Sequence, residues 1–225
     1  MKYTIEHAPV YATLKIELAQ GEQFRAESGA MLSMSPTIEL AATSSGKGIM
    51  GTLKAAVGGE SLFASMFTAA YGPGEVVLGP GAPGDIARVE LVNETWFAQS
   101  GSYLAGDPSL TLGTQGSIKA LISGEGLFLS KISGTGDLFV NSFGAIYHRD
   151  LAIGERYIVD TGHIVAFPSS VTYTIRKASR GLFSTLASGE GLVCEFMGPG
   201  RIYMQTRNVR ALANILSPFM ATSGA

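Results

Sequence analysis

The chain has 225 residues and a formal net charge of -2, and charged residues make up only 15% of it, where about 25% is usual in a soluble domain. The apolar content of 46% excludes an intrinsically disordered chain, and the lack of a Lys/Arg excess argues against a nucleic-acid-binding protein of the basic kind. Cys194 is the single cysteine, which excludes a disulfide-stabilised fold and is typical of a reducing compartment.

Membrane and targeting signals are weak throughout the chain. The N-terminus has no apolar segment of the kind that starts a secretory signal. The longest stretches without Asp, Glu, Lys or Arg are residues 161–175 and 211–225, each of 15 residues, whereas a membrane-spanning helix needs about 20 apolar residues. We therefore expect a cytoplasmic protein, and peripheral contact with a membrane stays open without being predicted.

Short periodic segments predict the secondary structure. Apolar and polar residues alternate over residues 14–18, 88–91 and 171–176, which predicts half-buried β-strands. Apolar residues recur three apart at Leu53/Ala56, Ile118/Leu121 and Phe183/Leu186, which predicts three short helices. Residues 209–216 predict a further short helix that stops near Pro218. The expected fold class is all-β with minor short helices.

An internal repeat organises the chain. Residues 51–62, 116–127 and 181–192 align without gaps, and their glutamates Glu60, Glu125 and Glu190 follow one another at intervals of 65 residues. Each copy continues into a Gly-x-Gly sequence, found at residues 72–74, 134–136 and 198–200. Because glycine supplies positive φ at a tight turn, each Gly-x-Gly predicts a hairpin.

The repeat also predicts the domain organisation. We expect one continuous body over residues 1–225, made of three units of about 65 residues, close to the lower size limit of an independent domain. Unit 1 spans residues 10–79, unit 2 spans 86–142 and unit 3 spans 143–208, and residues 209–225 form a C-terminal helix and tail. The Pro/Gly-rich residues 79–84 are predicted to link units 1 and 2.

The Gly-Glu-Gly-Leu copies, the Gly198-Pro199-Gly200 turn and the closing Gln205-Thr206-Arg207 resemble the altered inheritance of mitochondria family, member twenty-four, over residues 3–219. The resemblance implies three tandem units like those of the tryptophan RNA-binding attenuator protein (TRAP-like units, of the double-stranded β-helix class). It also implies a homotrimer in which nine units close a ring and so remove open sheet edges. The family has no established catalytic residues.

The repeated glutamates Glu60, Glu125 and Glu190 are the candidate site residues. They could form a ring of carboxylates that binds a cation or a basic ligand. They could instead accept backbone N–H bonds at a turn in each unit. Their repetition in every unit favours the structural interpretation, because features that define a fold repeat whereas ligand sites need not.

No other motif predicts chemistry. The histidines His7, His148 and His163 lack metal-ligand spacing, residues 46–51 fail the phosphate-loop pattern, and no serine lies in Gly-x-Ser-x-Gly. We therefore expect no enzyme activity, no metal and no cofactor, and we expect Cys194 to be a buried hydrophobic residue.

Two surface interpretations remain. RNA binding by analogy with the attenuator protein is not expected, because the repeat offers Lys54 and Lys119 but then Ser184. The apolar residues 49–50, 62–67 and 181–183 predict core and subunit interface, with exposed contact to a partner or membrane as the alternative.

The sequence thus predicts a homotrimeric, non-enzymatic scaffold or adaptor of unknown molecular function. It would recruit an unidentified partner protein or organise membrane-proximal machinery. A small-molecule-binding protein that uses clefts between repeat units is the alternative, and RNA binding is a distant one.

Overall fold

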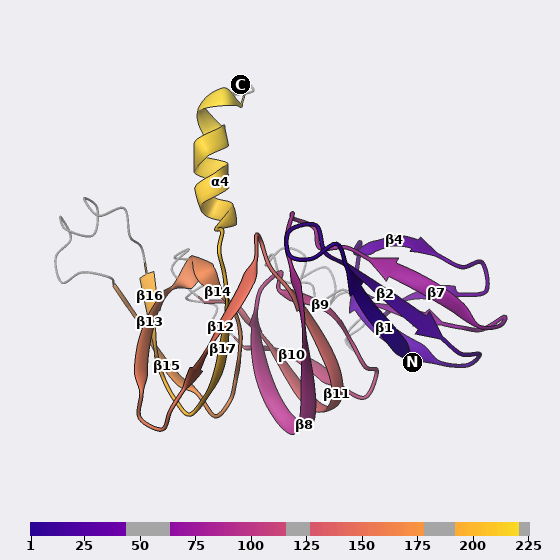
Figure 1. The fold of residues 1–225 in the computed structure, drawn as a ribbon, viewed down its shortest axis with the longest axis horizontal. Coiled ribbons are helices and arrows are strands. Elements are labelled where there is room, and N and C mark those ends of the chain that lie inside the picture. Colours follow the sequence, from indigo (N-terminus) through magenta and orange to yellow (C-terminus); the bar gives the residue numbers. More distant parts are fainter. Residues whose placement is uncertain (44–63, 116–126, 178–191, 221–225) are drawn as a thin grey trace, which may run out of the picture.

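The structure, a computed structural model, describes residues 1–43, 64–115, 127–177 and 192–220. These residues are mostly β-sheet with one short α-helix, which is the all-β class expected (Figure 1). The strands of the first third are β1 (Lys2–Glu6), β2 (Thr13–Leu18), β3 (Gln23–Glu27), β4 (Met31–Met34), β5 (Glu39–Thr43), β6 (Ala64–Thr68) and β7 (Gly74–Leu78). Those of the middle third are β8 (Ile86–Gln99), β9 (Tyr103–Gly106), β10 (Thr111–Gln115) and β11 (Leu129–Asn141). The last third contains β12 (Ile146–Leu151), β13 (Arg156–Asp160), η1 (Thr161–His163), β14 (Ile164–Pro168), β15 (Thr172–Lys177), β16 (Leu192–Met197), β17 (Gly200–Gln205), α4 (Val209–Leu216) and η2 (Ser217–Phe219).

One pairing scheme recurs in these three stretches, which follow one another from right to left in Figure 1. In the first stretch, β6 lies between β3 and β5, and β7 lies between β2 and β4. In the last stretch, β16 lies between β13 and β15, and β17 lies between β12 and β14. In the middle stretch, the long strand β11 takes the place of both central strands. Its first half lies between β10 and the end of β8, and its second half lies between the start of β8 and the strand β9.

The Gly-x-Gly sequences are not hairpin turns, so that prediction was wrong. The strands on either side of residues 72–74, β6 and β7, pair with different neighbours and not with each other, and the same holds for β16 and β17 around residues 198–200. Gly134 and Gly136 lie inside β11, where the register shifts, with φ of 135° and 147°. The glycines therefore serve bulges and corners at which the chain passes from one sheet ladder to the next.

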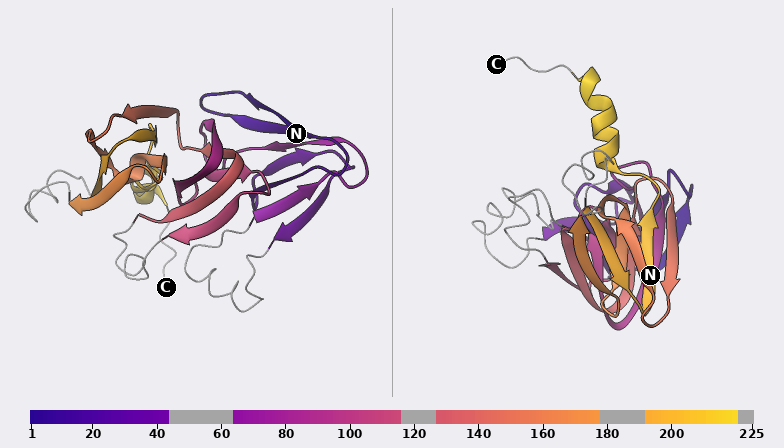
Figure 2. Two further views of the ribbon diagram at one scale, coloured as in Figure 1. Left: turned by 90° about the horizontal axis from the view of Figure 1, so that it is seen from below. Right: turned by 90° about the vertical axis from the view of Figure 1, so that its left-hand side faces the viewer.

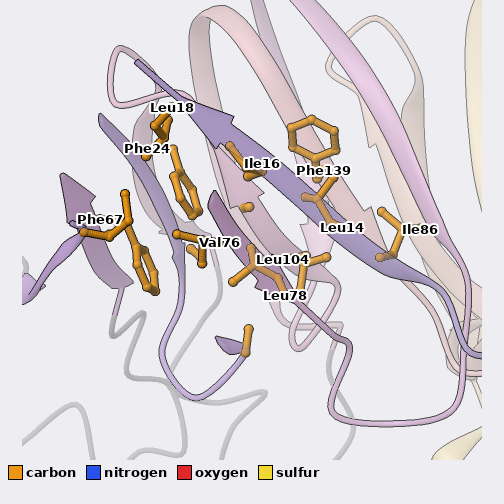
Figure 3. Close-up of a cluster of buried hydrophobic side chains, with 14 of the residues drawn as sticks. Leu14, Ile16, Leu18, Phe24, Phe67, Val76, Leu78, Ile86, Leu104 and Phe139 are labelled. Carbon is orange, nitrogen blue, oxygen red and sulfur yellow. The ribbon is translucent and has the colours of Figure 1, made fainter. Parts of the chain in front are cut away.

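Alternating side chains build the core, as the sequence period predicts. Leu14, Ile16 and Leu18 of β2 are at most 2% exposed and belong to one cluster with Phe24 and Phe67, whose rings stack with centroids 4.8 Å apart (Figure 3). This cluster also takes residues from β9 and β11 of the middle stretch, and the cluster of the last stretch takes others from β8 and β11. The three stretches therefore share their hydrophobic cores.

Two seams join the stretches with the same register. At the first, between β3 and β9, Arg25 lies opposite Gly106 and Ala26 lies opposite Ala105. At the second, between β8 and β14, Phe97 and Ala98 take these positions, opposite Phe167 and Ala166. The positions correspond because Arg25 and Phe97 each lie four residues before the glycine of a Ser-Gly turn. The backbone geometry of the seam is thus repeated with different side chains.

The Pro/Gly-rich segment at residues 79–84 is held at both ends. Gly79 N donates to Ala30 O, and the carbonyl of Gly84 accepts from Ala12 N at 2.9 Å. A Cβ on Gly84 would lie 1.6 Å from the carbonyl oxygen of Ser142, so only glycine fits there. The segment predicted as a linker is therefore packed against both neighbouring stretches.

The predicted C-terminal helix is confirmed as α4. Asn208 is its N-cap, and the Asn208 side chain accepts hydrogen bonds from the backbone N–H groups of Arg210 and Ala211. The helix projects away from the sheets in Figure 1 and in the right-hand view of Figure 2. Across the described ranges, no helix is long and apolar enough to cross a membrane.

Candidate functional site

The glutamates Glu60, Glu125 and Glu190 lie outside the described residues, as do the three predicted short helices and the positions Lys54, Lys119 and Ser184. Phe67 and Ala64, from the apolar segment at residues 62–67, are core residues that are 1% and 5% exposed.

His148, His163 and Cys194 make contacts within the fold. His163 Nδ1 lies 2.8 Å from the carbonyl oxygen of Gln205, and His148 contacts the ring of Tyr203. Within the residues that the structure describes, no three His, Cys, Asp or Glu side chains are grouped as metal ligands would be. Cys194 is fully buried, and burial raises the pKa of its thiol to about 12, so it stays protonated and unreactive at neutral pH.

One sheet edge, β4, is exposed where the strands at the same position in the other two stretches are buried. All four residues of β4 are exposed, and Leu32 keeps 61% of its surface. Every residue of β9 is buried, and so are the first four residues of β14. The cause is pairing: β9 pairs with β11 and β3, and β14 pairs with β17 and β8, but among the described residues β4 pairs with β7 alone.

A second edge, β13, lacks the neighbour that its counterparts have. β3 pairs with β6 and β9, and the matching part of β8 pairs with β11 and β14, whereas β13 pairs with β16 alone in the part of the chain that the structure describes. Ile158 occupies the position that Arg25 and Phe97 fill in the two seams, and it is 51% exposed. The outer strands β5, β10 and β15 occupy one position in the three stretches, and among the described residues each of the three pairs with one strand, so none of them lacks a neighbour that its counterparts have.

The two open edges have matching chemistry. An edge strand presents unpaired backbone N–H and C=O groups to which another strand can add. β4 contains no charged residue and exposes Met31, Leu32 and Met34, and β13 exposes Ile158 and Arg156. Beside β13, Glu195 forms ion pairs with Arg156 and with a second arginine on β15, which holds β13 against its own sheet. The open edges therefore favour backbone pairing and apolar contact over charge attraction.

Sequence reasoning singled out neither edge. Pairing partners come from distant segments, so the period-two pattern predicts a strand but not whether both of its edges are covered. The available signal was the run Met31-Leu32-Ser33-Met34, in which apolar residues fall on both faces of one short strand. Such a run is typical of a strand covered on both sides.

A buried amide without a partner marks the middle stretch. The Gln205 side chain accepts from Phe143 N and donates to Gly162 O, each at 2.9 Å. Asn141 occupies the same position, since it lies opposite Ile86 as Gln205 lies opposite Ile146. Its Oδ1 is buried and has no hydrogen-bond partner among the described residues.

Two local differences explain this unsatisfied acceptor. Asn141 is one methylene shorter than Gln205, and the residue corresponding to Phe143 is Pro83, three positions before the facing strand residue. Proline has no N–H to donate. The unsatisfied oxygen is therefore explained by the chain itself and gives no support to a ligand site.

One carboxyl group in the described chain has a strongly raised pKa. Glu27 ends β3, beside the first seam, and burial raises the pKa of its carboxyl from 4.5 to about 7. The counterparts at the end of β8 and β13 are Gln99 and Asp160, and Asp160 accepts from Gly162 N at 2.8 Å. Glu27 is therefore partly protonated near neutral pH, which links stability to pH.

Comparison with known proteins agrees with this architecture. The chain is 31% identical over 232 residues to an uncharacterized protein of Streptococcus pyogenes serotype M6, a match that covers 99% of this chain and 92% of that protein. A crystal structure of a Streptococcus pyogenes protein superposes with a TM-score of 0.81 at 29% identity, covering 97% of this chain and 99% of the other. Residues 3–207 match the family described as mitochondrial biogenesis AIM24. Because this match spans most of the sequence, the chain belongs to the mitochondrial biogenesis AIM24 family.

Proposed function

We propose that the protein is a non-enzymatic scaffold whose working form is a closed homotrimeric ring of nine TRAP-like units. The recurring pairing scheme supports the interpretation of three units in each chain. The single observation that carries the ring is the exposure of β4, set against the burial of β9 and β14. Inside the chain, β9 and β14 are each covered by a strand of the preceding unit. β4 belongs to the first unit, so the preceding unit that would cover β4 has to come from another copy of the chain.

The seams inside the chain predict how the copies join. The strand that covers β9 is β3, and the strand that covers β14 is β8. Their counterpart in the last stretch is β13, so β13 of one copy adds to β4 of the next. The shared register places Ile158 opposite Met34 of the next copy, and Val159 opposite its Ser33. Three such contacts close the ring, and each removes two open edges.

A closed ring of this kind suits a scaffold. It repeats one surface around an axis, so a partner protein with modest affinity for one copy can bind several copies and gain avidity. The described residues include no grouped metal ligands, and the one cysteine is buried. The partner protein is unidentified, and its binding face lies on the assembled ring.

The proposal predicts that Ile158→Asp breaks the assembly. The new carboxylate would lie directly opposite Glu195, whose charge already pairs with Arg156, and would be buried against β4 of the next copy, which carries no charge. We expect the trimer to weaken by about a hundredfold or more. Sedimentation velocity over a dilution series measures this change.

The matched control is Ile153→Asp. Ile153 is 88% exposed in the turn before β13 and lies on neither open edge. We expect this variant to assemble like the parent chain. If Ile158→Asp folds and assembles with unchanged affinity, the pairing of β13 with β4 is wrong.

A further inference from the structure

The C-terminal helix has an apolar face that its own chain leaves uncovered. α4 and η2 contain no buried residue. The exposed apolar side chains of α4, η2 and the residue that follows them are Val209, Leu212, Ile215, Leu216, Phe219 and Met220. At 3.6 residues per turn they gather on one side, and Arg210, Asn214 and Ser217 fall on the other. Arg210 is the only charge of the helix, which is too few cations for an electrostatic membrane anchor.

A second repeated contact shows what lies beside the base of this helix. A short lead-in segment precedes β2, β8 and β12. In the first two of these segments, the last backbone N–H donates to a carbonyl oxygen in the lead-in segment of the following stretch. Ala12 N donates to Gly84 O at 2.9 Å, and Asp85 N donates to Gly144 O at 3.1 Å. The third donor in this series is Ala145 N, because Ala145 stands one residue before Ile146 as Asp85 stands before Ile86.

A hydroxyl contact confirms that these positions correspond. Asp85 N also lies 3.2 Å from Ser142 Oγ, and Ala145 N lies 3.0 Å from Thr206 Oγ1. Asp85 N therefore has two acceptors, a hydroxyl and the carbonyl of the following lead-in segment. Ala145 N has the hydroxyl, and the carbonyl that would complete its series belongs to Tyr11, the counterpart of Gly84 and Gly144.

We propose that α4 is a clamp between copies, whose apolar face packs on residues 7–11 of the next chain. The inference rests on the proposed ring, which brings Tyr11 of the next copy beside Ala145 and Thr206. Val10 and Tyr11 are 41% and 71% exposed in the single chain and offer the apolar surface that α4 lacks. The occupant of the helix face is thus a second copy of this chain.

The base of α4 is fixed at this place. Thr206 N donates to Ala145 O at 3.1 Å, and Arg207 N donates to Phe143 O at 3.2 Å. Asn208 packs so closely on Gly162 that a Cβ there would lie 2.0 Å from Asn208 Nδ2. The first turn of the helix therefore starts from a rigid corner next to the seam between copies, and the exposed loop of the next chain lies within its reach.

The first test measures assembly of the full chain by mass photometry on dilution. The variant Leu212→Glu/Leu216→Glu places two carboxylates on the apolar face, and we expect the trimer to dissociate at concentrations about 10–100-fold higher than the parent. Asn214→Glu adds a carboxylate to the opposite face and is the matched control, with dissociation expected to be unchanged. An unchanged dissociation for the double variant would overturn the clamp.

The second test measures proximity. Cysteines at Tyr11→Cys and Val209→Cys, treated with a short bismaleimide, should give covalent dimers and trimers on a denaturing gel, while buried Cys194 stays unmodified. Replacing the first site by Ile153→Cys should give monomers only. Monomers from the Tyr11/Val209 pair in a chain that is still trimeric would also overturn the clamp.

The outcomes separate the clamp from the ring. A parent chain that is monomeric at micromolar concentration removes the ring and the clamp together. A trimeric parent with an insensitive double variant removes the clamp alone. Flotation with phosphatidylglycerol vesicles adds a third outcome: if the double variant loses vesicle binding while its trimer is unchanged, the helix face binds lipid and the clamp is wrong.

Discussion

The two seams inside the chain share one backbone register and differ in almost everything else. At the first, the Arg25 guanidinium reaches across to the carbonyl oxygens of Pro108 and Leu110, at 3.0 and 3.3 Å. At the second, Phe97 packs on Phe167 with ring centroids 5.5 Å apart. The comparison shows that strand pairing sets the seam, while the side chain in the central position can be cationic or aromatic. An aliphatic residue such as Ile158 on the open edge fits the same scheme.

The largest expected effect lies at the second seam. Phe167 is fully buried, so Phe167→Ala should lower the free energy of unfolding by about 3–5 kcal/mol. Arg25→Met, which loses two charge-assisted hydrogen bonds but keeps an apolar stem, should cost less, about 2 kcal/mol. Urea unfolding compares the two, with the exposed Lys131→Met as control. Equal costs would mean that the seams do not differ in the way their side chains indicate.

The buried amides Gln205 and Asn141, which occupy corresponding positions, should differ by a moderate amount in their effect on the free energy of unfolding. Gln205→Ala removes two hydrogen bonds and leaves Phe143 N and Gly162 O without partners, at a cost of about 2 kcal/mol. Asn141→Ala should stay within about 0.5 kcal/mol, because its buried oxygen already lacks a donor. Thermal unfolding of both variants checks this contrast, and a larger loss at Asn141 would contradict the assigned correspondence.

The smallest effect is a pH dependence at the first seam. The folded-state pKa of Glu27, about 7, lies above its ordinary value of 4.5, so the native chain binds more protons than the unfolded chain between these values. The free energy of unfolding therefore falls as pH rises from about 4.5 to about 7. Glu27→Gln should remove this fall and stabilise the chain by about 1–2 kcal/mol at pH 8. Urea unfolding at pH 5 and pH 8 measures it, with Glu39→Gln on exposed β5 as control, and an unaltered pH dependence would rule out the Glu27 assignment.

Local patterns predicted the parts of the fold that depend on local physics. Alternation at Leu14, Ile16 and Leu18 predicted a half-buried strand, and β2 is one. Residues 209–216, followed by the stop signal at Pro218, predicted the helix that is now α4. The family resemblance is confirmed over residues 3–207.

Long-range pairing is what the sequence could not predict. The Gly-x-Gly sequences looked like hairpins because glycine φ preferences are the same at a hairpin, a bulge and a corner. The open edges β4 and β13 could not be predicted from local sequence patterns, because an open edge is defined by a missing neighbouring strand. Neighbouring strands such as β3 and β9 are far apart in sequence. The candidate glutamates Glu60, Glu125 and Glu190 stay a prediction, since they lie outside the described residues.

The central claim is that each chain has two open edges, β4 in the first stretch and β13 in the last, and that each pairs with the other kind of edge on a neighbouring copy. Native mass spectrometry of the purified full chain at low micromolar concentration tests this most directly. The account predicts a single dominant species at three times the 23.5 kDa mass of the chain. A spectrum in which the single chain dominates at that concentration would contradict it.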